Sequence, residues 1–568
     1  MADRLLEICH TVSPDKMKPQ LLDSLALERE RGITIKLAPV RLQYNLNSEL
    51  FTLNLIDTPG HVDFSYEVSR ALAAVEGAIL LVDAVQGIQA QTLAHGLSAM
   101  EQDLVLIPVI NKIDLPNADV ESCKKQLVET FGFREDEIIL ASGKSGQGVE
   151  DILKAVIETV PPPKTEEEKP LRALIFDSFF DPYKGVVAQV RIVEGKVPPV
   201  GTKIKFLGTK AEGEVLEKGY FSPQLTQAES LKAGEIGYIA TGIKQPDLVR
   251  VGDTIALDFT VGQLPGYREV KPMVYVGLYP IEAQEYFELK EALSKFKLND
   301  PAFSYEPEQS SALGSGFRCG FLGLLHAEVV QERLLGEFNV NLLATTPSVE
   351  YLVGEAPINN PADLPQGENI KDLKEPWVSL KIFVPQSYIG AVMDLVQERR
   401  GKFLNMQHYG LQVELSYEMP LSEMITDFYD KLKSASSGFA SLDWDLLEFR
   451  EVDAARVDIL VGGEKVDALS TIVFRPKAES VGRRLAGKLK EVLPRQNFEI
   501  AIQATIGGKI VARETVSAFR KDVTAKLYGG DRTRKDKLLD KQKKGKKKMK
   551  MIGRVEIPQE AFLSILKN

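Results

Sequence analysis

The chain has 568 residues, a net charge of −10, 44% hydrophobic residues and 26% charged residues. This composition is ordinary for a globular protein and excludes a collagen-like or wholly disordered chain. The length predicts about four domains. Three widely spaced cysteines, Cys9, Cys123 and Cys319, favour neither a disulfide framework nor a zinc knuckle. No apolar run is long enough to predict a transmembrane helix, and we expect a cytoplasmic protein because the cysteines suit a reducing compartment.

Residues 1–163 are predicted to form an α/β domain. Apolar runs typical of buried strands alternate with amphipathic stretches such as residues 64–74. The expected strands are residues 53–56, 78–82 and 104–110. This alternation predicts one parallel sheet with helices on both faces. The Pro- and Glu-rich segment 160–169 then indicates a linker.

Short strands punctuated by Gly and Pro dominate residues 170–262, which predicts a small β-barrel. The expected strands are residues 186–193, 202–206, 235–240 and 253–257.

Two further blocks, residues 270–352 and 376–458, each mix strands with helices. The first has expected strands at 273–278 and 317–322 and expected helices at 281–295 and 327–338. The second has expected strands at 378–384, 412–417 and 443–449 and expected helices at 389–400 and 421–433. The order predicts two ferredoxin-like domains. Residues 460–568 form the last predicted domain, which begins with a β pattern.

Charge is distributed unevenly along the chain. Residues 520–554 contain 15 Lys and Arg against four Asp, a local net charge of +11, so the other 533 residues carry −21. A basic segment on an acidic body predicts RNA phosphate contact. The candidate RNA-binding residues are Lys541, Lys543, Lys544, Lys546, Lys547, Lys548 and Lys550. A solvated tail is one alternative, and an anionic membrane surface, with a peripheral inner- or plasma-membrane pool, is another.

The sequence Asp57-Thr58-Pro59-Gly60-His61 follows the first expected strand. A carboxylate at Asp57 can hold Mg²⁺ through water, and the Gly60 N–H can meet a γ-phosphate. The alternative is an ordinary turn after a strand, in which His61 is structural.

The sequence Asn111-Lys112-Ile113-Asp114 follows another expected strand. The Asp114 carboxylate can accept two N–H donors of guanine, while the Lys112 stem lies along the base and Asn111 joins neighbouring loops. A polar loop is the alternative. A third loop, with Ser142 and Lys144, can close over the base. Because open α/β sheets bind ligands at the carboxyl ends of their strands, the three motifs together predict a guanine-nucleotide site.

Upstream, residues 28–35 read ERERGITI and supply a hydroxyl at Thr34 that can complete the Mg²⁺ shell. The alternative for the charged half of this motif is a solvated helix face.

The motifs ERERGITI, DTPGHVDF and NKID, in this order, resemble those of translational GTPases. Residues 309–328, the YGGD sequence at 528–531 and the PQEAF sequence at 558–562 are similar to the elongation factor 4 (LepA) family. The resemblance covers essentially the whole chain. It implies a P-loop-type GTPase domain, a β-barrel, two ferredoxin-like domains and a family-specific C-terminal domain.

The resemblance also implies the activity and its partners. GTP would be the substrate, with Mg²⁺ as its cofactor, and His61 would position the attacking water. The ribosome, with ribosomal RNA of both subunits, and tRNA would be the partners of a monomer that affects tRNA position, translocation and translation fidelity.

One departure from the family concerns the GxxxxGK[ST] phosphate loop. The 568 residues contain no such motif, because the Gly143-Lys144-Ser145 sequence has Ile at position 138 where glycine is required. Residues 1–6 resemble the middle of the helix that follows the loop, so we expect a fragment or a miscalled start. The alternative function is therefore a non-catalytic protein that binds the ribosome or RNA.

Overall fold

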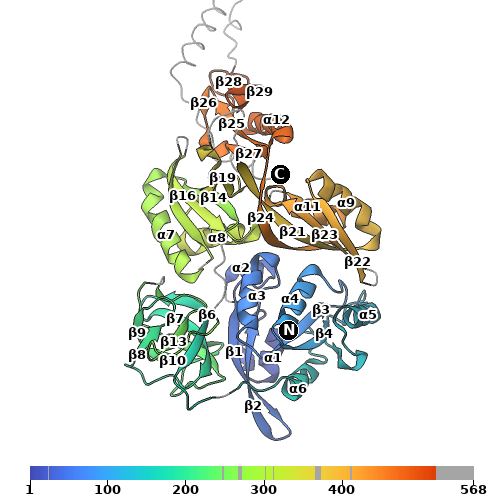
Figure 1. The fold of residues 1–568 in the computed structure, drawn as a ribbon, viewed down its shortest axis with the longest axis vertical. Coiled ribbons are helices and arrows are strands. Elements are labelled where there is room, and N and C mark those ends of the chain that lie inside the picture. The colour runs from blue at the N-terminus through green and yellow to red at the C-terminus, as the bar shows by residue number, and fades with distance from the viewer. Residues whose placement is uncertain are drawn as a thin grey trace, which may run out of the picture.

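The computed structural model describes residues 1–519, apart from 24, 165, 246–247, 266–271, 301, 311–312, 365–371, 410–411 and 426. The described residues form five regions stacked in three tiers (Figure 1). The N-terminal region and an eight-stranded sheet form one end, two α/β regions lie in the middle, and residues 454–516 form the other end.

The strands of the N-terminal region fall into two separate sheets. β1 (Ala38–Leu46) and β2 (Glu49–Asp57) form an antiparallel hairpin. β3 (Gly77–Asp83), β4 (Val105–Asn111) and β5 (Ile139–Leu140) form a parallel sheet in that order. The prediction that residues 53–56 join the parallel sheet as a buried strand is therefore wrong. No ladder among the described residues connects β2 to β3, and the last five residues of β2 are only half-buried.

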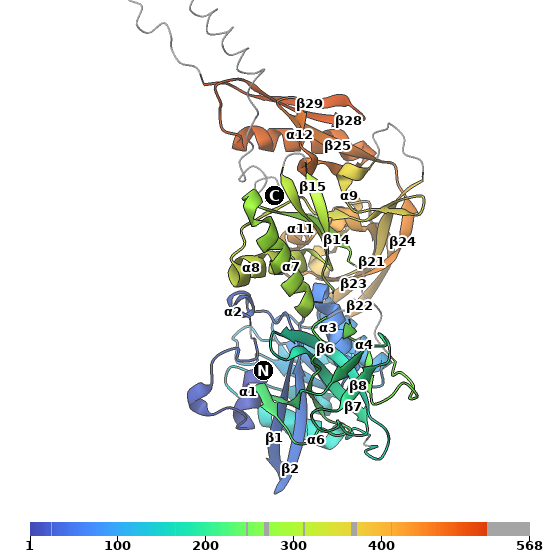
Figure 2. The same ribbon diagram turned by 90° about the vertical axis from the view of Figure 1, so that its left-hand side faces the viewer.

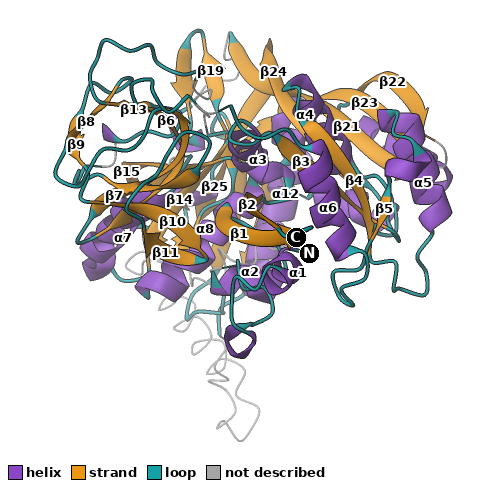
Figure 3. Ribbon diagram, turned by 90° about the horizontal axis from the view of Figure 1, so that it is seen from below, coloured by secondary structure: helices purple, strands orange, loops and turns teal. Residues whose placement is uncertain are grey.

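Helices and the N-terminus connect these two sheets. Met1 packs into the core around β1 and β2 and also into the core around β4, while Leu5 and Leu6 contribute to the first core. The N-terminus accordingly lies between β1 and α6 (Figure 3). The helices of this region are α1 (Ala2–Ile8), α2 (Ala26–Arg31), α3 (Ser65–Leu72), α4 (Ala90–Glu101), α5 (Val120–Phe131) and α6 (Val149–Thr159).

The eight-stranded sheet is antiparallel, in the order β11-β10-β12-β7-β6-β13-β8-β9. Every second residue of β7 from Val186 to Ile192 contributes to its core, as the two-residue period of a strand requires. The strands are β6 (Arg172–Asp181), β7 (Gly185–Glu194), β8 (Lys203–Phe206), β9 (Glu212–Glu214), β10 (Glu217–Ser222), β11 (Gln224–Gln227), β12 (Ile236–Ala240) and β13 (Thr254–Ala256).

The first middle region has the chain order β14-α7-β15-β16-α8-β17 and the sheet order β15-β16-β14-β17, with β18 also paired to β14. The predicted helix at 281–295 begins later, at Tyr286, because a 3₁₀ turn occupies residues 283–285. The elements are β14 (Val274–Pro280), α7 (Tyr286–Asn299), β15 (Ser304–Ser310), β16 (Gly314–Phe321), α8 (Leu324–Phe338), β17 (Leu342–Ala344) and β18 (Ser348–Val349).

The second middle region has the sheet order β20-β19-β21-β23-β22, with β24 on the other edge of β21. The single helix predicted at 421–433 is two helices, α10 and α11. The elements are β19 (Tyr351–Val353), β20 (Ala356–Ile358), β21 (Leu373–Pro385), α9 (Ile389–Glu398), β22 (Lys402–Tyr409), β23 (Gln412–Pro420), α10 (Leu421–Met424), α11 (Phe428–Ala435) and β24 (Ser441–Glu451).

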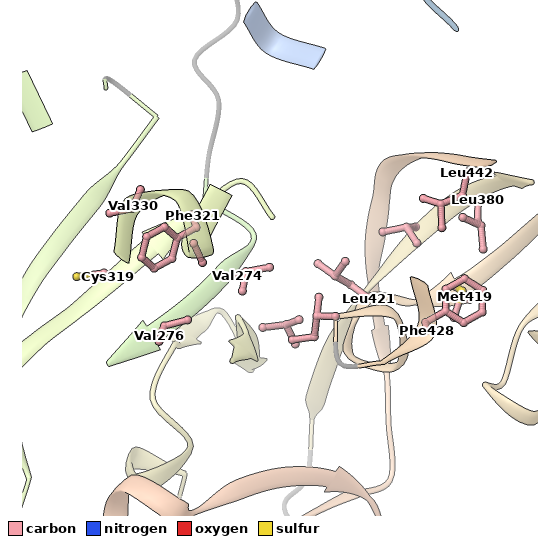
Figure 4. Packing of buried hydrophobic residues seen from close by; sticks show 14 of the residues in the cluster. Val274, Val276, Cys319, Phe321, Val330, Leu380, Met419, Leu421, Phe428 and Leu442 are labelled. Atoms are coloured by element: carbon pink, nitrogen blue, oxygen red, sulfur yellow. The ribbon is translucent and has the colours of Figure 1, made fainter. Parts of the chain in front are cut away.

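The two middle regions share one hydrophobic core. Figure 4 shows Val276 and Phe321 from the first region and Leu421 and Phe428 from the second, all members of a single cluster of buried side chains. Because burial of apolar surface is the main stabilising term, this shared core favours a fixed relation between the two regions.

The last described region is a five-stranded sheet, in the order β26-β25-β28-β29 with β27 paired to β25. α12 buries Ala478, Gly482, Ala486 and Leu489, and its alanines and Leu489 belong to the core of this sheet. The elements are β25 (Ala454–Val461), β26 (Glu464–Lys465), β27 (Thr471–Phe474), α12 (Arg475–Val492), β28 (Ile500–Ile506) and β29 (Lys509–Val516).

Candidate functional site

Two of the predicted guanine-binding loops are joined by side-chain hydrogen bonds. Ser142 is fully buried, and its Oγ donates to Asp114 Oδ1 at 2.7 Å and accepts from the Ser145 N–H at 3.0 Å. The Gly143 N–H donates to Asn111 Oδ1 at 2.9 Å. The hydrogen bond from Ser142 lowers the pKa of Asp114, whose carboxyl is exposed. An ionised, accessible carboxylate at this position can accept the two N–H donors on one edge of guanine.

The remaining predicted residues of these loops lie around this network. Lys112 has a left-handed backbone (φ 64°), and its Nζ lies 2.7 Å from Asp83 Oδ2 at the end of β3. Ile113 is half-buried and packs against the core beside α5, whereas Lys144 is exposed. Arg4 of α1 donates to the carbonyl oxygens of Gly143 at 3.0 Å and Lys144 at 2.7 Å.

The predicted Mg²⁺ ligands are linked through a residue that the sequence motifs do not include. The Thr34 hydroxyl donates to Asp23 Oδ1 at 3.0 Å. Burial, and to a smaller extent the charge of Asp23, raise the pKa of Asp57 to about 6. Hydroxyl and carboxylate oxygens are the ligands that Mg²⁺ prefers, and a cation would relieve the repulsion between the two carboxylates. The donor set therefore fits Mg²⁺. Among the described residues, no group of three or more His, Cys, Asp and Glu has metal-binding geometry.

Glu28 gives the ERERGITI motif a structural role. Its carboxylate is buried and accepts from the N–H groups of Leu25, Ile35 and Lys36 at 2.8–3.1 Å. The interpretation of the whole charged half as a solvated helix face is therefore wrong for Glu28. Arg31 is also partly withdrawn from solvent, because it lies 3.2 Å from Glu328 and 2.5 Å from Glu332, both on α8.

His61 lies where the N-terminal region meets both middle regions. Its Nδ1 accepts from the Asp63 N–H at 3.2 Å, so the neutral ring carries its proton on Nε2. Its ring is edge-on to Phe64 and to Tyr429 of α11, with centroid distances of 6.3 and 6.1 Å. Burial lowers the pKa of His61, and so does Lys433. Next to this segment, a Cβ added at Gly60 would meet no described atom within 4 Å.

The structure thus brings together Asn111, Asp114 and Ser142. Thr34 is hydrogen-bonded to Asp23, whose charge also acts on Asp57. Sequence reasoning missed Arg4, Asp23 and Asp83. An Asp at the end of a strand, as at Asp83, was the only available signal. The seven predicted RNA-binding lysines at 541–550 lie outside the described residues.

Comparison with known proteins follows these regions along the chain. Residues 1–162 match the GTP-binding domain of elongation factor Tu, residues 372–460 match the C-terminus of elongation factor G, and residues 461–567 match the C-terminus of the GTP-binding protein LepA. Elongation factor 4 of Thermus thermophilus is 54% identical over 578 residues, which cover 100% of this chain and 95% of the relative. The chain belongs to the elongation factor 4 family.

Other members support the same assignment. Elongation factor 4 of Desulfitobacterium hafniense is 53% identical, with 100% of this chain and 96% of the relative covered. The chain therefore belongs to the translational GTPases, and its N-terminal region is a GTP-binding domain of the elongation factor Tu type. The mixed α/β multidomain architecture is confirmed at this level.

A solved structure also shares the fold. A crystal structure of another protein from Thermus thermophilus has a TM-score of 0.57 and 17% identity, and the match covers 79% of this chain and 94% of the other. Within the part of the elongation factor 4 chain that the structure describes, no helix is long and apolar enough to span a membrane.

Proposed function

We propose that this elongation factor 4 protein hydrolyses GTP to GDP and phosphate on the ribosome and thereby affects tRNA position, translocation and translation fidelity. The hydrogen-bonded network of Asn111, Asp114 and Ser142 carries this proposal. It leaves an ionised carboxylate exposed between two loops that meet at the carboxyl ends of β4 and β5. That arrangement suits recognition of guanine.

The other site residues receive roles from their chemistry. Lys112, Ile113 and Lys144 border the base, and the Gly60 N–H faces the phosphates. Thr34 and Asp57 would hold Mg²⁺, which neutralises phosphate charge when bound. His61 orients the attacking water through a ring nitrogen. Phosphoryl transfer depends on such positioning more than on a strong base, so a histidine with a lowered pKa suits the task.

The finer architecture and the partners belong to the same proposal. We infer a small β-barrel at 170–262, ferredoxin-like domains at 270–352 and 376–458, and a family-specific domain at 460–568. The partners are ribosomal RNA of both subunits and tRNA, met by a cytoplasmic monomer. The lysines at 541–550 contact RNA phosphates. Their alternative ligand, an anionic membrane surface, would place a fraction of the protein at the membrane periphery.

The test compares wild type with His61→Ala in single-turnover GTP hydrolysis, with and without saturating ribosomes. Both are assayed as the 568-residue chain and as that chain extended with the N-terminal strand and phosphate loop of a family member. His61→Ala should keep its GTP affinity and lose about 10²-fold or more of the ribosome-stimulated rate. A rate within a few-fold of wild type would make His61 structural. Ribosome binding without hydrolysis by either wild-type chain would favour a non-catalytic binding protein.

A further inference from the structure

The segment that follows Asp57 is clamped by two helices from other domains. The Asp63 carboxylate accepts from the N–H groups of Leu325 at 2.9 Å and His326 at 3.4 Å, at the start of α8. From the other side, the Tyr429 ring of α11 lies edge-on to His61 at an interplanar angle of 75°. Figure 2 shows α2 of the N-terminal region beneath α8. His61 is therefore held within a domain interface rather than on a free loop.

The α11 contact belongs to a wider docking of its domain onto the GTP-binding domain. The Ala90 N–H at the start of α4 donates to Ser441 Oγ of β24 at 2.7 Å, and Gln91 Nε2 donates to the Leu442 carbonyl at 3.2 Å. Phe383 of β21 joins the core of the GTP-binding domain. Because these contacts fix the position of the domain, a movement that undocks it would also withdraw Tyr429 from His61.

The charges around His61 come from this interface. Asp63, Lys433 of α11 and Glu328 of α8 are the charged groups that act on the imidazole. Asp57 is influenced by another set, which comprises Asp23, the N-terminal amine and Asp3. The charges that act on the ring therefore belong to its own segment, to α8 and to α11, whereas Asp57 is influenced by Asp23 and Asp3.

We propose that Tyr429 restrains His61: it retains the His61 ring in the domain interface, so that His61 becomes available to the nucleotide only when α11 moves away. This inference rests on the role of His61 in the proposed function. Tyr429 acts through His61 and touches no substrate. The Lys433 ammonium, 4.6 Å from the centre of the Tyr429 ring, stacks on that ring and steadies it.

The contact itself can be tested without nucleotide on the 568-residue chain. The chain has five histidines, so ¹³C-labelled imidazole signals are few, and the His61 signal is identified by its loss in His61→Ala. Tyr429→Ala should shift this signal and raise the pKa of His61 towards its ordinary value, because burial lowers that pKa here. Tyr429→Phe keeps the ring and should leave the signal in place. An unchanged His61 signal in Tyr429→Ala would overturn the inference.

The consequence is tested by GTP hydrolysis without ribosomes, in whichever of the two chains described above is active. Tyr429→Ala loses the interaction free energy of one aromatic pair, so its GTP hydrolysis without ribosomes should be about 2- to 10-fold faster than in wild type. Tyr429→Phe should stay near wild type. The matched control, Tyr183→Ala, removes a tyrosine that is 94% exposed and should change nothing. The double variant Tyr429→Ala/His61→Ala should lose this increase in rate. If Tyr429 only stabilised the fold, the effect of its replacement would not depend on His61.

The outcomes separate this inference from the proposed function. Ribosome-stimulated hydrolysis by wild type with an unchanged or slower basal rate in Tyr429→Ala overturns the inference alone. Absence of hydrolysis in both wild-type chains overturns the proposed function and the inference with it. If Tyr429→Ala fails to fold, Tyr429→Leu replaces it, because leucine keeps apolar volume but loses the ring.

Discussion

Asp114 and Asp57 show how neighbouring loops give the same side chain different chemistry. Ser142 donates a hydrogen bond to Asp114 and lowers its pKa, whereas burial and a second carboxylate raise the pKa of Asp57 to about 6. Hydrogen bonds to the charged form and desolvation are opposing causes of such shifts. Asp114 is thus ready to accept N–H donors from a base, and Asp57 is suited to a cation.

We predict that Asp114→Asn shifts nucleotide preference from GTP towards xanthosine triphosphate. An amide at this position sets an N–H donor against the N–H donors of guanine, while xanthine offers a carbonyl oxygen in place of the amino group. Competition binding of both nucleotides to the extended chain is the measurement. Glu158→Gln, which removes an exposed carboxylate of α6, is the matched control. Guanine selectivity that survives in Asp114→Asn would remove Asp114 from the base site.

Residues within contiguous motifs could be predicted, but their supporting residues could not. Asn111 and Asp114 follow an apolar strand, which suggested their common location. Arg4 reaches the Gly143 loop across 139 positions of the chain, and Asp23 bonds to Thr34 from outside the motif that contains Thr34. Their types are common and their neighbours unremarkable, so only the tertiary fold reveals them.

At the scale of elements, α8 is the helix that meets both the ERERGITI and the DTPGHVDF motifs. Arg31 of the first motif pairs with two glutamates on its exposed side, and Asp63 of the second accepts N–H groups at its N-terminus. A carboxylate at a helix N-terminus satisfies free N–H groups and interacts favourably with the helix dipole. A displacement of either motif would therefore break contacts that the motif makes with α8.

We predict that Asp63→Ala loosens the first turn of α8. A capping carboxylate is worth about 1 kcal/mol, so amide hydrogen exchange at Leu325 and His326 should accelerate about 5-fold. Exchange followed by mass spectrometry over residues 322–330 measures this effect, with the far end of α8 as the internal reference. Asp63→Asn keeps an acceptor oxygen and should show a smaller change. Equal exchange in Asp63→Ala and wild type would mean that the contact does not stabilise the helix.

The basic run at 541–550 is the second element with a predicted role. Replacing Lys543, Lys544, Lys546, Lys547 and Lys548 by Gln should weaken ribosome binding and flatten its salt dependence. Each lost phosphate contact lowers the log–log slope of affinity against salt by about 0.7–0.9. The same five positions changed to Arg retain the charge and should retain the slope. An unchanged slope in the Gln variant would mean that these lysines are solvated and do not contact RNA phosphates.

The elements themselves were predicted unevenly. Strands with continuous apolar runs, such as β4 and β14, were found close to their observed bounds. Among the strands that were missed, β22 exposes most of its residues, β15 contains Glu, Pro and Gln, and β17 has only three residues. The α10–α11 break was also missed, since residues 421–433 contain no Pro or Gly to signal it.

At the scale of the whole molecule, the described strands of the GTP-binding domain are divided between two sheets. β2 and β3 belong to separate sheets, and Leu81 of β3 is 41% exposed although its strand is apolar. Met1 packs into the cores of both sheets, whereas the side chains of α1 pack into the core of β1 and β2. Strand edges without ladder partners are unfavourable, so this arrangement predicts a less stable first domain than the shared core of the middle regions.

We predict that the 568-residue chain binds GTP very poorly, although its base loops are in place. Asn111 and Asp114 address only the base, whereas the triphosphate carries most of the charge. Triphosphates are normally held by a nest of backbone N–H groups at a helix N-terminus, with a lysine and a Mg²⁺-binding hydroxyl, and the 568 residues contain no GxxxxGK[ST] motif.

Calorimetric titration with GTP compares this chain with the chain extended by the first strand and phosphate loop of a family member. The extension should raise affinity to the micromolar range or better and slow amide exchange along β2 and β3, which would gain a ladder partner. Residues from about 170 onward should exchange alike in both chains. Micromolar binding by the 568-residue chain itself would show that another segment holds the phosphates, and Arg4 and Lys144, which meet at the edge of the base loops, would then be the first residues to replace.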